Sequence, residues 1–188
     1  MRQSLVSFRR VPFMRNVIVR SLLLAPFLAL LAGCAGIGAP APQRVLPMPE
    51  PGAAVRTIRA ADDGLDSAVQ IAPLRDAAID GFLADARAAE AGGRLDAAVG
   101  AVERALELAP DAPDILQFRA ELDVARGDWL AAERRAVQSF KLGPKVGGLC
   151  ARNWQTLIQA RIALDDPPTV AQARQRLAEC RVKPRVRM

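Results

Sequence analysis

The apolar positions between residues 79 and 146 repeat at an offset of 34 residues: Gly93 returns as Gly127, and Pro110 returns as Pro144. The glycines lie in short turns, and the prolines follow apolar runs spaced by three and four residues, which is the spacing of one helix face. Each period therefore predicts two helices that form a hairpin. Since a hairpin of this size cannot bury its apolar side alone, we expect the hairpins to stack as a solenoid.

The same pattern predicts an all-α domain over residues 61–181. We expect an α-α superhelix of about three helical hairpins: the repeats 79–112 and 113–146, and a divergent hairpin over 147–181. In the third hairpin the period weakens, but apolar residues keep the helical spacing on both sides of the stop signal 165–168. The expected helices begin near Pro73 or Leu74, Leu95, Ala112, Asp128, Leu149 and Thr169.

Small and apolar residues recur in the two repeats at positions typical of the tetratricopeptide repeat (TPR) family. They are Phe82, Ala86, Gly93, Ala98, Val102, Ala105 and Pro110 in the first repeat, and Leu116, Ala120, Gly127, Ala132, Ala136, Ser139 and Pro144 in the second. The chain resembles this family over residues 79–146. It departs from the family at Asp85 and Arg119, where leucine is usual, and at Ala89 and Asp123, where an aromatic residue is usual.

The resemblance implies a right-handed stack in which the first helix of each hairpin lines a concave groove. In the TPR family this groove holds an extended peptide or a partner helix. Carried over by position, the groove residues are Leu83, Arg87, Glu90, Gln117, Glu121, Val124, Arg152, Gln155 and Gln159. The Lys, Asn and Arg set with which chaperone-linked TPR domains bind a C-terminal carboxylate is absent, so we do not expect capture of an acidic chain end.

The first 33 residues have the features of an export signal. Arginines precede an apolar run over residues 21–31, which is too short to span a bilayer comfortably, and small residues follow it. The sequence LAGC that ends at Cys34 resembles the lipobox of bacterial lipoproteins, which implies cleavage before this cysteine and its lipidation. An ordinary signal peptide with an incidental cysteine is the alternative. Met14 is an alternative start to Met1.

The segments around the domain complete the organisation of the chain. Ala35 follows the cysteine; in Gram-negative lipoproteins an aspartate there usually retains the protein at the inner membrane, so the resemblance implies an anchor in the outer membrane, facing the periplasm. Residues 34–60 hold the lipidated cysteine and are rich in proline and alanine, which predicts a flexible tether. Residues 182–188 are expected to form a basic tail.

Once Cys34 is lipidated, two cysteines remain. Cys150 precedes the turn residue Asp165 by as many residues as Cys180 follows it, so the two cysteines come level in antiparallel helices. Neighbouring helices can bring two Cα atoms within the ~7 Å that a disulfide needs, and the periplasm is oxidising. We therefore predict a Cys150–Cys180 disulfide, with a pair of buried thiols as the alternative.

Composition narrows the function classes. The chain contains no histidine and no tyrosine, which removes Ser-His-Asp arrangements and His-ligated zinc, and it has no glycine-rich phosphate loop. We expect no enzymatic activity, no cofactor or metal and no nucleic-acid partner. Trp129 takes a position that packing explains. Trp154 takes a small-residue position of the TPR family and serves either the core or ligand stacking.

Charge is distributed unevenly: acidic residues outnumber basic ones over residues 61–133, and basic residues outnumber acidic ones over 134–188. An uneven charge distribution gives information about which partners a protein attracts more than about its fold. Taken together, these features predict a lipid-anchored periplasmic TPR adaptor that binds a protein partner in envelope assembly. The alternative is a structural lipoprotein that contacts lipopolysaccharide or peptidoglycan through its basic C-terminal half. Self-association by end-to-end stacking of a second copy is a further alternative.

Overall fold

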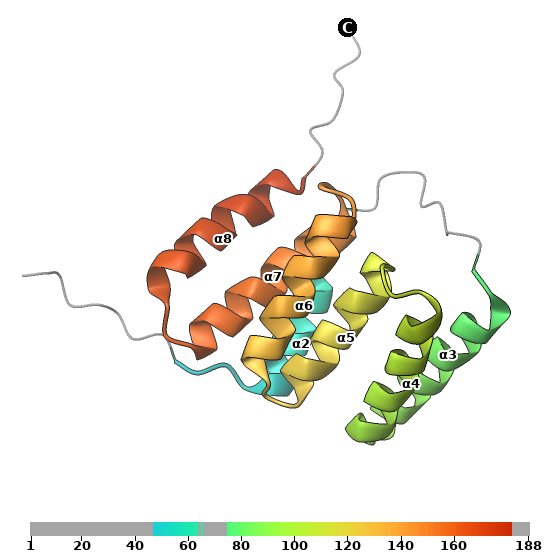
Figure 1. Cartoon of the computed structure of the whole chain (residues 1–188). Helices are drawn as coiled ribbons and strands as arrows, with labels where there is room; N and C mark the ends of the chain where they lie inside the picture. Colours follow the sequence, from blue (N-terminus) through green and yellow to red (C-terminus); the bar gives the residue numbers. More distant parts are fainter. Residues whose placement is uncertain (1–46, 64, 66–74, 182–188) are drawn as a thin grey trace, which may run out of the picture. The chain divides into compact units, whose positions relative to one another are not determined.

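The computed structural model describes residues 47–63, 65 and 75–181, and these residues are all-helical, as predicted (Figure 1). The signal segment, Cys34 and the basic tail 182–188 lie outside the described residues, as does the expected helix start near Pro73 or Leu74. The seven helices of the described residues are α2 (Pro51–Ala60), α3 (Ala77–Ala91), α4 (Leu95–Leu108), α5 (Pro113–Ala125), α6 (Trp129–Leu142), α7 (Gly148–Ala163) and α8 (Pro167–Glu179).

Six of these helices pair in chain order, α3 with α4, α5 with α6 and α7 with α8 (Figure 1). Each pair packs on the next, because α4 contacts α5, and both α5 and α6 contact α7. Gly93 and Gly127 close two of the turns with φ of 73° and 76°, a conformation that favours glycine. The repeated glycine of the sequence pattern therefore marks the turn inside each of the first two pairs.

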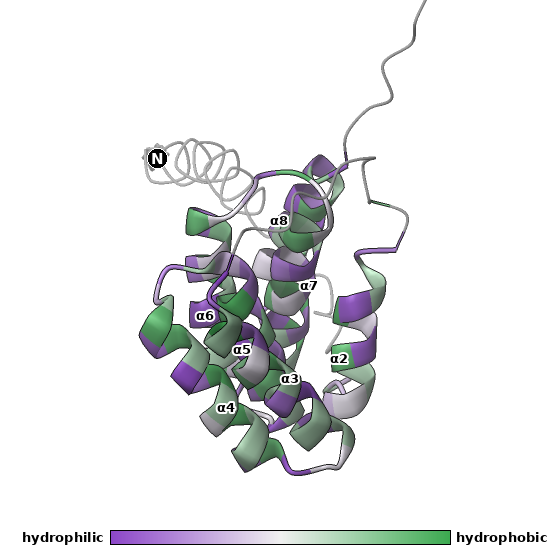
Figure 2. Ribbon diagram, turned by 90° about the vertical axis from the view of Figure 1, so that its right-hand side faces the viewer, coloured by the Kyte–Doolittle hydropathy of each residue, from purple (hydrophilic) through white to green (hydrophobic). Residues whose placement is uncertain are grey.

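Alanine allows the helices to approach closely. Six alanines on α3 to α6 have no exposed surface, and larger apolar side chains fill the space between them. Figure 2 shows that each helix carries both hydrophobic and hydrophilic residues, as helices on a shared core require. These buried alanines are Ala86, Ala98, Ala105, Ala120, Ala132 and Ala136.

One boundary of the sequence analysis is wrong: residues 51–60, which were expected in the flexible tether, form α2. This helix packs against α5 and α7. Its one proline, Pro51, does not interrupt it, because Pro51 occupies the first turn, where the missing N–H has no helical partner. The Glu50 side chain accepts hydrogen bonds from the backbone N–H groups of Gly52 and Ala53, at 2.8 and 2.6 Å. These local features favour a helix in an otherwise proline-rich segment.

Cys150 and Cys180 are joined by a disulfide, with their Cα atoms 5.6 Å apart, and both residues are buried. The bond links the start of α7 to the end of α8, as the spacing of the cysteines predicts. Trp154 packs beside it, with its ring edge against Phe140 and the ring centroids 5.0 Å apart. Of the two roles considered for Trp154, the structure places the ring in packing.

Candidate functional site

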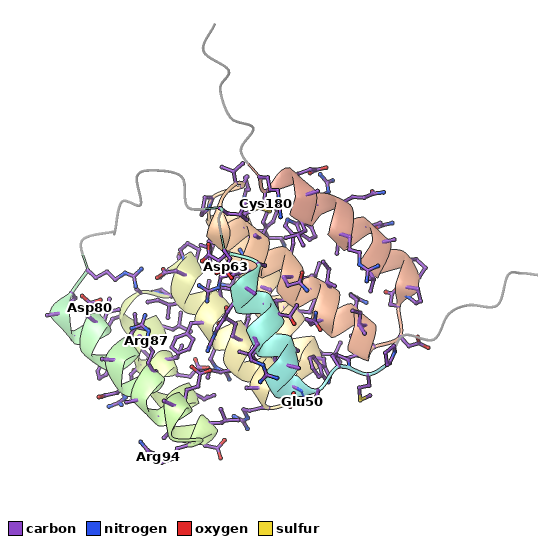
Figure 3. The ribbon with its side chains drawn as sticks, turned by 180° about the vertical axis from the view of Figure 1, so that it is seen from behind. Glu50, Asp63, Asp80, Arg87, Arg94 and Cys180 are labelled. Carbon is purple, nitrogen blue, oxygen red and sulfur yellow. A yellow bond between two sulfur atoms is a disulfide. The ribbon has the colours of Figure 1, made fainter. Side chains whose placement is uncertain are left out.

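The expected groove is covered by α2. We use the name groove face for the surface under this helix, formed by Glu90 of α3, Glu121 and Val124 of α5, and Arg152 of α7. Figure 3 shows α2 in front of the other helices, with Glu50 labelled at its start and Asp63 just beyond its end. Helices α3, α5 and α7 are the first helices of their pairs, and four of the positions carried over from the TPR family lie on this face.

The apolar part of the contact comes from the middle and the second half of α2. Ala54, Val55 and Ile58 are buried there, spaced so that they share one side of the helix. They pack against Val124 at the end of α5 and against the start of α6, where Ala132 is buried and Trp129 is partly buried. Each larger side chain contributes about 1.5–3 kcal/mol when fully buried. This apolar contact is small for an element of the fold.

The polar half of the contact centres on Glu121, whose side chain has no exposed surface. Arg59 of α2 donates from Nε to Glu121 Oε2 at 2.9 Å, and Arg152 donates from Nε to Oε1 at 2.9 Å. Gln117 Nε2 donates to Oε1 at 3.1 Å. A buried carboxylate is costly without hydrogen-bond partners, and these three donors supply them to Glu121.

Arg59 also bonds to Glu90 of α3, with Nη2 and Oε1 2.8 Å apart. Burial opposes the charge of Arg59, but hydrogen bonds and attraction from Glu121 and Glu90 outweigh it and raise the pKa of Arg59. The guanidinium therefore stays protonated while it joins α2 to α3 and α5. A lysine would supply the charge without the fork of donors that reaches two carboxylates at once.

The other predicted groove residues fall into two groups. Arg87 is exposed beside the groove face, with its guanidinium 5.8 Å from the Phe118 ring centroid, and Gln155 is half-buried on the α7 side of α2. Leu83, Gln117 and Gln159 are buried. Leu83 belongs to the core shared by α3, α4 and α5, so its assignment to the groove is wrong. Figure 3 shows Arg87 on α3.

Two open cavities flank α2. One, of about 550 Å³, lies between α2, α3, α5 and α7, and its charged lining includes Arg59, Arg87 and Glu121. The other, of about 450 Å³, lies between α2, α7 and α8, and its lining includes Gln155 and Leu177. The helix therefore fills only part of the space above the groove face. Side chains longer than those of α2 have room on both sides.

Two departures from the TPR pattern are explained by charge pairing. Arg119 and Asp123 are both buried and form an ion pair within α5. Arg119 also donates to Glu103 of α4 at 2.6 Å, and Arg135 of α6 donates to Asp123 at 2.6 Å. Burial raises the pKa of Asp123, although both arginines oppose the shift. An ionic contact among α4, α5 and α6 thus occupies the place of the leucine and the aromatic residue.

Sequence reasoning missed Arg59 and the three apolar residues of α2. The available signals were the acceptor Glu50 directly before Pro51 and the spacing of Ala54, Val55 and Ile58. They were outweighed by the many prolines of the segment. Among the residues that the structure describes, no group of side chains is suited to hold a metal ion, and no helix there is long and apolar enough to cross a membrane.

In comparisons with protein-family models, with curated proteins and with solved structures, no match to this chain was found.

Proposed function

We propose that this protein is a lipid-anchored adaptor of the periplasm that binds a protein partner through its groove face and has no catalysis of its own. The observation that carries the proposal is that the groove face holds a helix, α2, through apolar side chains and through an ion pair between the partly exposed Arg59 and the buried carboxylate of Glu121. A surface that binds one amphipathic helix can bind a second helix with the same spacing of anchor residues, because helix-in-groove binding depends on regularly spaced side chains.

The stack of α3 to α8 supports a TPR-like superhelix of three hairpins. The repeated turn glycines, the small residues at the helix contacts and the pairing of consecutive helices all agree with it. In this proposal Cys34 carries the lipid, the segment before α2 is the tether, and the domain faces the periplasm from the outer membrane. The Cys150–Cys180 disulfide suits an oxidising compartment.

Photocrosslinking in living cells tests the adaptor role. A photoreactive amino acid replaces Arg87, which is exposed at the edge of the groove face, and a control replaces Arg134, which is exposed on α6. Gln117 is unsuitable because it has no exposed surface. We expect one dominant protein to be captured at position 87 and not at position 134.

The result that would overturn the proposal is the absence of any captured protein at position 87. In that case the basic C-terminal half should be tested against lipopolysaccharide and peptidoglycan, which is the alternative function. Loss of envelope association at high salt would favour that alternative, because salt screens contacts between exposed charges.

A further inference from the structure

We propose that α2 is an internal competitor for the groove face, and that the partner displaces it with an amphipathic helix of similar chemistry. Such a helix presents small and β-branched apolar side chains on one side, followed directly by an arginine, as Ala54, Val55, Ile58 and Arg59 do in α2. The inference rests on the proposed function and specifies the partner's chemistry.

The arginine is the most specific part of this recognition. Glu121 and Glu90 present two carboxylates from different helices, and Arg59 reaches both, with N–O distances of 2.9 and 2.8 Å. A guanidinium can serve two acceptors in fixed directions, so a partner helix needs an arginine at this place. The apolar residue just before it, Ile58 in α2, has no exposed surface.

Departure of α2 would not leave Glu121 as an unpaired buried charge. Arg152 and Gln117 both donate to Oε1, whereas Arg59 bonds to Oε2. The carboxylate thus keeps two donors from α5 and α7 when α2 leaves. Breaking a buried ion pair is costly mainly because it leaves one charge without a partner. This cost is absent for Glu121 when α2 leaves.

The connection of α2 to the domain also allows displacement. Residues 61–76 join α2 to α3, whereas residues 164–166 join α7 to α8. A longer connection lowers the effective concentration of a tethered helix at its site, so a free helix competes with it more easily. The cavities on both sides of α2 leave its flanks open to side chains of an incoming helix.

A peptide experiment with the full-length chain tests competition directly. The probe is a fluorescently labelled peptide with the sequence of residues 47–63, and the receptor variant is Arg59→Glu, which places a negative charge beside Glu121. The matched control is Arg56→Glu, which makes the same charge change at an exposed position of the same helix. We expect the peptide to bind the Arg59→Glu chain about tenfold or more tightly than the wild-type or Arg56→Glu chain, because α2 no longer blocks the site.

Two further samples keep the test decisive. Arg59→Ala is the milder variant if Arg59→Glu lowers the helix content measured by circular dichroism by more than the 10 residues of α2, and the same order of affinities is expected with it. A peptide that itself carries Arg59→Glu should not bind. Equal or absent binding of the wild-type peptide to natively folded variant and control chains would overturn the proposal.

Crosslinking separates this inference from the proposed function. With the photoreactive residue at position 87, we expect capture of the partner to rise several-fold in the Arg59→Glu background and to stay unchanged in the Arg56→Glu background. Capture of one partner to the same extent in all backgrounds would leave the adaptor role standing and overturn competition by α2. Capture of nothing in any background would overturn the adaptor role itself, whatever the peptide does.

Discussion

Helices α2 and α8 both pack against α7, and both bury few apolar side chains. Those of α2 are Ala54, Val55 and Ile58, and those of α8 are Val170 and Ala173. The two helices are attached differently. Helix α8 follows α7 after residues 164–166 and is bonded to it through the Cys150–Cys180 disulfide. Helix α2 is joined to α3 by the longer segment 61–76 and forms an ion pair with α5 through Arg59. With similar apolar burial, α8 is held by a covalent bond, whereas α2 is the helix that we propose to dock reversibly.

The two helices thus differ in their attachment to the domain more than in the number of apolar side chains that they bury. A covalent bond and a short turn hold α8 at its site in every state of the folded chain, and they restrict the unfolded chain as well. The ion pair of Arg59 can be exchanged for an equivalent one from another helix. The groove face is thus built from fixed elements on α3, α5 and α7 and one replaceable element, α2.

The largest effect is expected from removing the bond that fixes α8. Replacing both cysteines, Cys150→Ser with Cys180→Ser, should lower the free energy of unfolding by about 3–4 kcal/mol, because the closed loop separates residues 30 apart in sequence. Urea unfolding followed by tryptophan fluorescence measures the loss, and reduced wild-type chain is the control. An unchanged unfolding midpoint would show that the contacts of α8, not the bond, fix it.

The next largest change in stability is expected from truncating a buried isoleucine, and it should differ between a fixed helix, α5, and the replaceable helix, α2. Ile115→Ala in α5 should lower the free energy of global unfolding by about 2–5 kcal/mol, because the surrounding core relaxes only partly and a cavity remains. Ile58→Ala in α2 removes an equally buried side chain but should mainly increase hydrogen exchange within α2, with a small change in the global midpoint. Equal losses of global stability in the two variants would contradict the difference between these elements.

Substitution of two glycines by alanine should change stability by smaller amounts and in opposite directions. A Cβ at Gly148 would lie 1.4 Å from Asp62 Oδ1, so Gly148→Ala should displace the Asp62 carboxylate, at a cost of about 1 kcal/mol. A Cβ at Gly81 of α3 meets no atom within 4 Å, so Gly81→Ala should stabilise by up to about 1 kcal/mol. Thermal unfolding of both variants checks the signs, and stabilisation by Gly148→Ala would disprove the close approach.

The smallest effect is the pH dependence of α2 docking. Backbone hydrogen bonds from Gly52 and Ala53 lower the pKa of Glu50 below its ordinary value of 4.5. The charged cap thus stabilises α2 fully above pH 4.5, and this contribution is lost as the pH falls through the lowered pKa of the folded state. Fluorescence of Trp129, which packs against α2, should report the change in a Trp154→Phe background, and Glu50→Gln should remove it. A response that persists in Glu50→Gln would assign it to another group.

Much of the fold was predictable because its signals are local. The 34-residue offset with Gly93 and Gly127 gave the turns, and the predicted second helix of the first repeat coincides with α4, Leu95–Leu108. The disulfide followed from helix geometry, since both cysteines lie at equal distances along the chain from one turn. These features depend on helix period and on turn chemistry, which a sequence displays directly.

The candidate site was predictable only in part because its decisive contacts are not local. Position in the repeat pointed to Glu121 and Arg152, but Arg59, which bonds to Glu121, lies 62 residues before it in the chain. Helix α2 is only 10 residues long and has proline-rich surroundings, so its cap alone does not make it stable and its helical state depends on docking. Tertiary contacts outweigh weak local preference in such a segment.

Native-state hydrogen exchange on the full-length chain tests reversible docking of α2 most directly. The measurement compares the slowest backbone amides of α2 with those of α8 as denaturant is added, which separates local opening from global unfolding. We predict that α2 opens in a separate step, with amides at least about tenfold less protected than those of α8, while α5 and α7 stay closed. Equal protection of α2 and α8, lost together in one global step, would contradict the account.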